Sequence, residues 1–270
     1  MFNLNPVKEF TLPVAAECIS PDVFENKKPS EIETLKVWEG NKHRTLGELF
    51  KVQETRGSDT DITIDGNVGE FREIGAKMTK GSILIKGNAG MHVGKEMKTG
   101  KITILGNAGA WTGSMMTGGE IEIQGDSADF LAAPYWGTRR GMKGGRITVY
   151  GNAGNEVGSC MSEGIIKIHG AVGQFTGFRM CGGTIHVHGG CGARAGACMT
   201  DGKIVVSGHA GVILPTFEIE GVKIKVKIEQ GETIEDAFYV FLGDHVENGR
   251  GKLYVSKEKN PQLKLYEKFL

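Results

Sequence analysis

The sequence predicts an all-β fold: a right-handed parallel β-helix of about eight coils with an N-terminal and a C-terminal cap. Three features lead to this prediction: the glycine content, a spacing of about 19 residues between glycine turns, and apolar residues at fixed positions before each turn. Glycine supplies 42 of 270 residues, more than twice its ordinary usage of about 7 %. Because only seven residues are proline, the composition is not that of collagen or a disordered linker, and it indicates many turns with positive φ.

The glycine turns recur at a regular spacing. The steps between the first glycines of successive G-N-A-G-like turns are 21, 19, 19, 26, 19, 19 and 19 residues. These glycines, which number the repeats from one to eight, are Gly66, Gly87, Gly106, Gly125, Gly151, Gly170, Gly189 and Gly208. Such steps are too short for a crossover helix between parallel strands. We therefore expect a coiling chain, with coils stacked about 4.8 Å apart and a right-handed path.

Each repeat is expected to contain one short strand. Ile stands four positions before the turn glycine in all eight repeats, and Ile or Val stands two positions before it. Alternating β-branched residues indicate a strand with one buried face. A further core position, nine residues before the glycine, is occupied by Met78, Met97, Met116, Met142, Met161, Met180 and Met199. Stacking in register also predicts an amide ladder of Asn67, Asn88, Asn107 and Asn152.

Three regions follow from this pattern: an N-terminal cap region over residues 1–59, the parallel β-helix over 60–221, and a C-terminal cap region over 222–270. Caps are expected because the open ends of a strand stack would otherwise pair with other chains. The first region contains a candidate capping box at Ser30 and Glu33. The last region opens with apolar residues alternating with Lys223, Lys225 and Lys227, which predicts a strand with a solvated lysine face.

Charge, hydropathy and cysteine usage exclude several classes of function. Lys plus Arg and Asp plus Glu are 32 each, so no net charge attracts nucleic acid or an anionic membrane. Apolar runs are far shorter than the roughly 18 residues of a membrane span, and the first residues lack a signal pattern, so we expect a cytoplasmic protein. The five cysteines include no C-x-x-C and are expected to be free thiols rather than disulfides or ligands of zinc or iron–sulfur clusters.

The fourth repeat carries seven extra residues around the segment AAPYWGTRRGMKGG. This insertion is expected to form a projecting loop that carries Tyr135, Trp136, Arg139 and Arg140. Tyr, Trp and Arg are the residue types that anchor protein interfaces, so these four residues form the candidate partner interface. The alternative is that Tyr135 and Trp136 fold back on the outer wall.

No catalytic, cofactor-binding or metal-binding residues are predicted. His169, His186 and His188 are expected on the outward face of neighbouring coils, where they have the geometry to bind a metal. No carboxylate occupies the adjacent positions, however, and exposed histidines usually have no special role. The sequence contains no G-x-S-x-G, no H-E-x-x-H and no recognisable carboxylate pair. Outward apolar residues that hint at a covering partner are Leu84, Leu105, Tyr150 and Val205.

The motif G-x-x-G-x-x-x-G occurs in five repeats, beginning at Gly87, Gly106, Gly151, Gly170 and Gly189. This pattern resembles the glycine-repeat domain shared by the C-terminal part of the glutamate synthase large subunit and the C subunit of formylmethanofuran dehydrogenase. The chain length and the flanking segments TLGELFKVQE and FLGDHVENGRGKLYV favour the second. Repeat one departs from the motif with Glu73 at the third glycine, and repeat four with Ala128 at the second.

The resemblance implies a non-catalytic scaffold subunit that docks the catalytic subunits of an archaeal complex. That complex would be a tungsten or molybdenum formylmethanofuran dehydrogenase, which reduces CO2 to formylmethanofuran in the first step of methanogenesis. The pterin metal, iron–sulfur clusters and hydrolase metals would belong to the partner subunits. Alternatives are a subunit of a formyltransferase/hydrolase complex, a free-standing glutamate synthase domain, or an enzyme with its own site on the wall of the coils.

Overall fold

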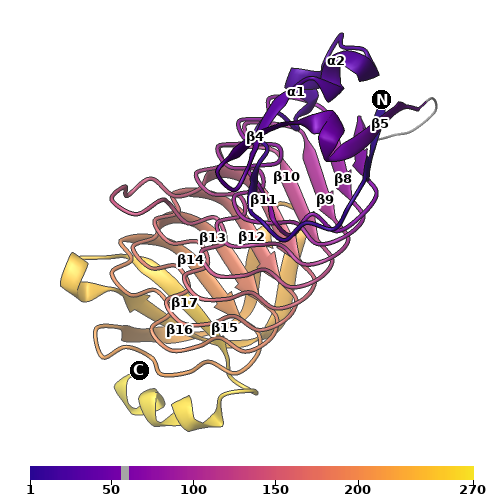
Figure 1. Cartoon of the computed structure of the whole chain (residues 1–270). Helices are drawn as coiled ribbons and strands as arrows, with labels where there is room; N and C mark the ends of the chain where they lie inside the picture. The colour runs from indigo at the N-terminus through magenta and orange to yellow at the C-terminus, as the bar shows by residue number, and fades with distance from the viewer. Residues whose placement is uncertain (56–60) are drawn as a thin grey trace.

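The computed structural model of the protein, which describes residues 1–55 and 61–270, is mostly β (Figure 1). Within these ranges the strands form a 13-stranded mixed sheet and a 4-stranded sheet. The sequence predicted an all-β fold, and the structure confirms that the fold is mostly β, with a few short helical segments. The predicted boundary between residues 59 and 60 lies outside the described residues.

A run of parallel strands forms the centre of the large sheet. Each repeat contributes one strand, and each strand pairs in parallel with the strand of the next repeat. The strands are β6 (Ile62–Ile64), β8 (Ser82–Ile85), β9 (Lys101–Ile104), β10 (Glu120–Ile123), β11 (Lys143–Val149), β12 (Glu163–Ile168), β13 (Cys181–Val187) and β14 (Asp201–Val206). A second line of parallel bridges links the same repeats, from Val68 through Ala108 and Ala153 to Ala210. Successive repeats therefore lie against each other along two separate lines.

The predicted core positions are buried. Both Ile/Val positions of every repeat and all seven methionines of the predicted column are enclosed. Residues at equivalent positions lie directly above one another, as where Ile83 pairs with Ile102 and Ile85 with Ile104. Burying one such side chain contributes about 1.5–3 kcal/mol, so the two strand positions and the methionine account for much of the cohesion of each repeat.

Glycines serve two different purposes in the repeat. Gly113, the third glycine of its motif, has φ +67°, a conformation that side-chain-bearing residues rarely adopt. Gly106, the first glycine, has no positive φ, but a Cβ there would lie 2.7 Å from the Gly87 carbonyl of the preceding repeat. The expectation of positive φ thus holds for the third glycine, whereas the first is required by close approach of two backbones.

The predicted asparagine ladder exists in a different chemical form. The Asn88 side-chain oxygen accepts from the Asn107 backbone N–H at 2.8 Å, and the Asn107 oxygen accepts from the Asp126 N–H at 2.8 Å. Asn152 does the same for Ala171 at 2.9 Å. Each of these hydrogen bonds therefore joins a side-chain oxygen to a backbone N–H of the next repeat, and does not join two side-chain amides. Asn67 instead accepts from the Gly69 N–H of its own turn.

Repeat one differs from the pattern expected from the sequence. Gly75, not Glu73, occupies the third-glycine position, with φ +68° and a geometry like that of Gly94 in repeat two. The assignment of Glu73 to that position was wrong because the two extra residues of this repeat form β7 (Phe71–Arg72), which pairs with β2 (Val14–Ala15). The irregularity thus joins the repeats to the N-terminal region.

The N-terminal region extends both sheets. Strand β1 (Phe2–Pro6) pairs in parallel with β6 and antiparallel with β5 (Phe50–Glu54). The smaller sheet has the order β4-β3-β2-β7. The remaining elements are α1 (Pro21–Phe24), α2 (Pro29–Glu33), β3 (Lys36–Glu39), β4 (Lys42–Thr45) and the 3-10 turn η1 (Leu46–Glu48).

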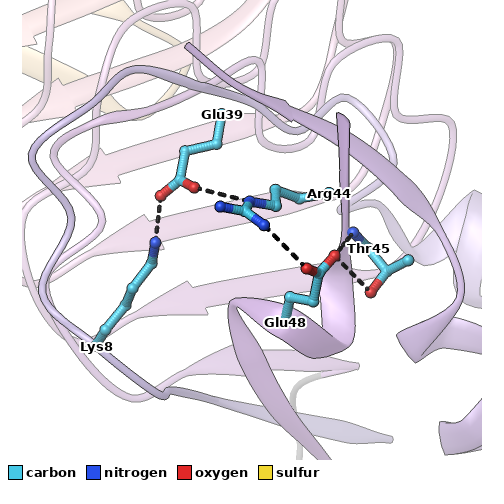
Figure 2. A network of polar contacts seen from close by, with 5 residues as sticks. All are labelled: Lys8, Glu39, Arg44, Thr45 and Glu48. Atoms are coloured by element: carbon cyan, nitrogen blue, oxygen red, sulfur yellow. Dashed lines mark hydrogen bonds and ion pairs between the residues drawn. The ribbon is translucent and has the colours of Figure 1, made fainter. Parts of the chain in front are cut away.

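Polar contacts hold the small sheet to the preceding loop. Glu39 is buried and accepts from Lys8 and from Arg44, and Arg44 also reaches Glu48 (Figure 2). The hydrogen bond from Lys8, together with that from Arg44, holds the pKa of Glu39 below its ordinary value.

The capping box predicted at Ser30 and Glu33 is wrong. Helix α2 begins two residues earlier than expected, with Lys28 rather than Ser30 as its N-cap, so Glu31 accepts from the Lys28 backbone N–H at 2.7 Å. The Glu33 carboxylate instead accepts from the Val52 N–H at 3.3 Å.

The C-terminal region continues the large sheet at the other end (Figure 1). Strands β15 (Glu218–Glu229) and β16 (Glu232–Gly243) form an antiparallel hairpin, and β17 (Gly251–Ser256) pairs with β16 and in parallel with β14. The 3-10 segments η2 (His245–Glu247) and η3 (Pro261–Phe269) complete the chain. The strand predicted from residue 222 is confirmed with its lysines exposed, although Ile224 is also 71 % exposed.

The tip of the β15–β16 hairpin is fastened to the outer face of the repeats. Arg146 donates through both terminal nitrogens to Glu229, and Lys167 bridges Glu229 and Glu232. Arg146, followed by Lys167, lowers the pKa of Glu229 to about 2. Beneath the hairpin, Val205 packs in a second apolar cluster with Val226 and Phe238.

Candidate partner interface

The insertion of repeat four forms a loop that leaves and rejoins the repeat within one turn. The Ala132 N–H donates to the Thr112 carbonyl at 2.8 Å before the loop, and the Met142 N–H returns to the Ala132 carbonyl at 3.2 Å after it. Gly141 approaches repeat five so closely that a Cβ would lie 2.4 Å from the Ser159 carbonyl. The regular repeat thus continues on both sides of residues 133–141, which we name the repeat-four loop.

Tyr135 folds back on the wall, as the alternative interpretation expected. Its hydroxyl hydrogen-bonds with His92 Nε2 at 2.9 Å, and its ring stacks on the imidazole with centroids 4.9 Å apart. Lys95 Nζ lies 5.2 Å from the centre of the same ring. Tyr135 therefore anchors the loop while keeping 38 % of its surface exposed.

Trp136 projects into solvent, as the interface interpretation expected. It is 81 % exposed, and its only ring contact within the described chain is an edge contact with Phe130 at 6.4 Å. Arg139 and Arg140 are also exposed. An exposed indole on the same loop as two arginines that form no ion pair within the described residues has the composition of an interface anchor.

An aromatic row beneath the loop was not predicted from the sequence. His92, Trp111 and Phe130 occupy equivalent positions in successive repeats, all with positive φ. Their rings stack in order, with centroids 5.4 Å and 4.5 Å apart. Burial lowers the pKa of His92, and both His92 Nδ1 and Trp111 Nε1 are buried without a partner within the described residues. Their shared distance of five residues from the turn glycine was the sequence signal for this row.

A groove of about 260 Å³ runs beside the loop, towards repeats five and six. Its lining includes Trp136, Arg139, Cys160, Phe178 and Arg179. Burial raises the pKa of the Cys160 thiol, although Arg179 and Arg139 act in the opposite direction. Glu156, hydrogen-bonded by Ser159 at 3.3 Å, is the one carboxylate in this lining.

The three predicted histidines lie together but differ in exposure. His169 stacks on His188 at 4.6 Å, and His188 contacts His186 at 4.0 Å. His188 is exposed, whereas His186 is 1 % exposed and contacts Ser207 Oγ at 3.0 Å. Burial, followed by the neighbouring His188, lowers the pKa of His186 to about 3. The outward position of His186 is therefore covered, contrary to the expectation of a solvent-facing side chain.

The outward apolar residues also differ in their exposure to solvent. Leu105 and Tyr150 are exposed, and Tyr150 stacks on His169 at 4.9 Å. Val205 is covered by the hairpin of the same chain, so its burial needs no partner.

Three further findings concern the part of the chain that the structure describes. No group of three or more His, Cys, Asp or Glu side chains there is arranged to hold a metal ion. No helix in these ranges is long and apolar enough to cross a membrane. The five cysteines are free thiols, as predicted.

This chain is similar in sequence to known proteins. No family model matches the chain. The C subunit of the molybdenum-containing formylmethanofuran dehydrogenase 1 of Methanothermobacter thermautotrophicus is 42 % identical over 92 residues, which cover 34 % of this chain and 23 % of that protein. The chain resembles the C subunit of formylmethanofuran dehydrogenase. The corresponding subunit of the tungsten-containing formylmethanofuran dehydrogenase 2 of Methanothermobacter marburgensis is 43 % identical over 93 residues, covering 33 % of this chain and 34 % of that protein. The matches thus span about a quarter to a third of these relatives.

A solved structure is similar over nearly the whole chain. It is a chain in the crystal structure of the formyltransferase/hydrolase complex (FhcABCD) from Methylorubrum extorquens in complex with methylofuran. The TM-score is 0.85 at 27 % sequence identity, and the match covers 94 % of this chain and 99 % of that chain. The predicted resemblance to the C subunit of formylmethanofuran dehydrogenase is confirmed by the sequence relatives, and the structural neighbour comes from a multi-chain complex.

Proposed function

We propose that this chain is a non-catalytic scaffold subunit that docks the catalytic subunits of a formylmethanofuran dehydrogenase complex. The observation that carries the proposal is the structural similarity to one chain of a multi-subunit complex over 94 % of this chain. The sequence identity to the C subunit of molybdenum and tungsten enzymes supports the same assignment. In this proposal the pterin metal, iron–sulfur clusters and hydrolase metals are held by partner subunits.

The proposed scaffold is a right-handed parallel β-helix of about eight coils over residues 60–221. The in-order parallel pairing of β6 to β14 and the second line of bridges support this interpretation. Residues 1–59 and 222–270 would act as caps. Their strands occupy the two ends of the 13-stranded sheet, with β5 at one edge and β15 at the other.

A related assignment is a subunit of a formyltransferase/hydrolase complex. The structural neighbour favours it, because its complex has that name. Both assignments give the chain the same docking role, and they differ in whether the partners include a tungsten or molybdenum oxidoreductase.

The proposed docking surface includes the repeat-four loop with Tyr135, Trp136, Arg139 and Arg140. Tyr135 fixes the loop through its hydrogen bond with His92. Trp136 is left free to enter a pocket on a partner.

Purification of the tagged full chain from its native source, with mass spectrometry of bound proteins, tests this function. We expect catalytic subunits of a formylmethanofuran dehydrogenase or a formyltransferase/hydrolase. Recovery with flavin and glutaminase proteins would instead favour the glutamate synthase alternative. Stoichiometric tungsten, molybdenum or iron on the separated chain would refute the non-catalytic assignment.

The loop is tested by Trp136→Ala, with Trp38→Ala as the matched control. Trp38 is 47 % exposed on β3 in the N-terminal region, and its ring contacts His43 at a tilted angle. We expect Trp136→Ala to weaken recovery of partners at least tenfold, whereas Trp38→Ala leaves it unchanged. Equal recovery with both variants would remove the loop from the interface.

A further inference from the structure

Arg139 of the repeat-four loop belongs to a larger surface of arginine and aromatic side chains. Arg139 and Arg179 line the same groove, together with Trp136 and Phe178. The Arg179 guanidinium lies 5.1 Å from the centre of the Phe178 ring.

The same pattern continues into the neighbouring side chains. Phe178 contacts Phe175 edge to face at 5.7 Å, and the Arg194 guanidinium lies 5.1 Å from the centre of the Phe175 ring. The surface thus runs without interruption from the loop to repeat seven. We name Trp136, Arg139, Phe175, Phe178, Arg179 and Arg194 the arginine–aromatic surface.

The guanidinium groups of this surface have unused hydrogen-bonding capacity. Among the described residues, Arg139, Arg179 and Arg194 form no ion pair, whereas Arg146 pairs with Glu229. Within the described ranges, Arg194 donates only to the Gln174 side chain, at 3.3 Å. A guanidinium that stacks on an aromatic ring keeps its edge donors available for a carboxylate, which it binds through two parallel hydrogen bonds.

The positive charge is local rather than a property of the whole wall. Arg179 and Arg194 occupy positions with φ +54° and +65°, and the equivalent positions of other repeats carry Glu96 and Glu156 with φ +55° and +57°. The repeat therefore accepts either sign of charge at these positions. Arginines gather at repeats six and seven, beside the loop that carries two more.

We propose that the arginine–aromatic surface docks an acidic segment of a partner protein, whose carboxylates bind Arg139, Arg179 and Arg194. Charge complementarity supports this assignment, because these three arginines form no ion pair among the described residues, and the guanidinium groups of Arg179 and Arg194 lie over aromatic rings. This inference rests on the proposed docking function, because it names the chemistry of the partner at that interface.

Charge reversal at Arg179 and Arg194 tests the inference in the full chain. Glu96 and Glu156 show that glutamate fits the backbone at these positions, so Arg179→Glu with Arg194→Glu should fold normally. The matched control is Arg250→Glu, because Arg250 is also exposed but lies beside β13 and β14 with Lys203. Binding of the co-purifying partners is measured at low and at high salt.

We expect the double variant to bind at least a hundredfold more weakly and to lose most of the salt dependence of the native chain. Arg250→Glu should bind normally. Native affinity and salt dependence in the double variant would overturn the acidic-partner inference but leave docking intact. Failure of the native chain to bind any partner would instead refute the proposed function.

A second measurement identifies the partner groups. Arg179→Lys and Arg194→Lys keep the charge and introduce amines that a zero-length carbodiimide reagent couples to nearby carboxylates. We expect cross-links from these lysines to Asp or Glu of a partner. In an assembled complex, the absence of any such cross-link would contradict the proposal.

Discussion

Substitution by alanine at two adjacent glycines, Gly189 and Gly190, should change the stability of the protein in opposite directions if the repeats stack as described. A Cβ at Gly189 would lie 2.5 Å from the Gly170 oxygen of the preceding repeat and 2.6 Å from its carbonyl carbon. A Cβ at Gly190 would have no neighbour closer than 3.5 Å, and neither residue has a positive φ. Gly189→Ala therefore forces two backbones apart, whereas Gly190→Ala does not.

The size of each effect follows from these distances. Separating the backbones by about half an ångström to relieve the overlap costs about 1–3 kcal/mol. The hydrogen bond from the Gly189 N–H to the Gly170 carbonyl, now 3.0 Å, would also lengthen and lose about 0.5–1.5 kcal/mol. Gly190→Ala should instead stabilise the protein by about 0.4–1 kcal/mol, because alanine restricts the unfolded chain.

Equilibrium urea unfolding followed by circular dichroism measures both variants. We expect Gly189→Ala to lower the free energy of unfolding by about 2–4 kcal/mol relative to the native chain. Equal stability of the two variants would refute backbone contact between repeats as the reason for glycine at this position.

Three further predictions concern the hairpin, the histidines and the core. Glu229→Gln should lower the free energy of unfolding by about 1–3 kcal/mol, because Arg146 and Lys167 lose their shared carboxylate. The control Glu235→Gln alters an exposed pair with Lys225 and should change the free energy of unfolding by less than about 0.5 kcal/mol. A similar loss in both variants would contradict a special role for Glu229. The pKa of His186 falls from 6.5 to about 3 on folding, so between these pH values the unfolded chain binds a proton that the folded chain does not. The resulting stabilisation is complete above pH 6.5, and on acidification to about pH 5.5 the native chain should lose about 1.4 kcal/mol more of its free energy of unfolding than His186→Gln. Parallel curves of stability against pH for the two proteins would contradict this prediction. Ile121→Ala should cost about 2–5 kcal/mol in urea unfolding, since Ile121 is fully buried between Ile102 and Ile147, and a loss below about 1 kcal/mol would show that this core position is loosely packed.

The repeat made much of the fold predictable. Ile and Val at alternate positions, together with one methionine per repeat, identified the strands and the buried side chains because every repeat buries its equivalent positions in the same way. Stacked repeats must also place equivalent residues in contact, which is why the order of the parallel strands followed from spacing alone.

The errors arose where the chain leaves this pattern. The two extra residues in repeat one became β7, and their pairing with β2 depends on a distant segment that periodicity cannot reveal. His186 was expected in solvent but is 1 % exposed. Val205, its partner on the neighbouring strand, is covered by the C-terminal hairpin, whose contacts follow no sequence repeat.

The candidate site was predictable in composition but not in geometry. The insertion and its Tyr, Trp and Arg residues were visible in the sequence. The division between an anchored Tyr135 and a projecting Trp136 depends on His92, which lies 43 positions away in the chain. The row formed by His92, Trp111 and Phe130 was missed because its members differ in residue type, unlike the glycine and isoleucine positions of the repeat.

Hydrogen exchange of the full chain, free and in its native assembly, tests the docking role most directly. We predict that backbone amides of residues 133–141 and of the segments around Phe178 and Arg194 become protected in the assembly, while the edge strand β4 in the N-terminal region exchanges as in the free chain. Unchanged exchange at the repeat-four loop in an intact complex would contradict the claim that this loop is where partners bind.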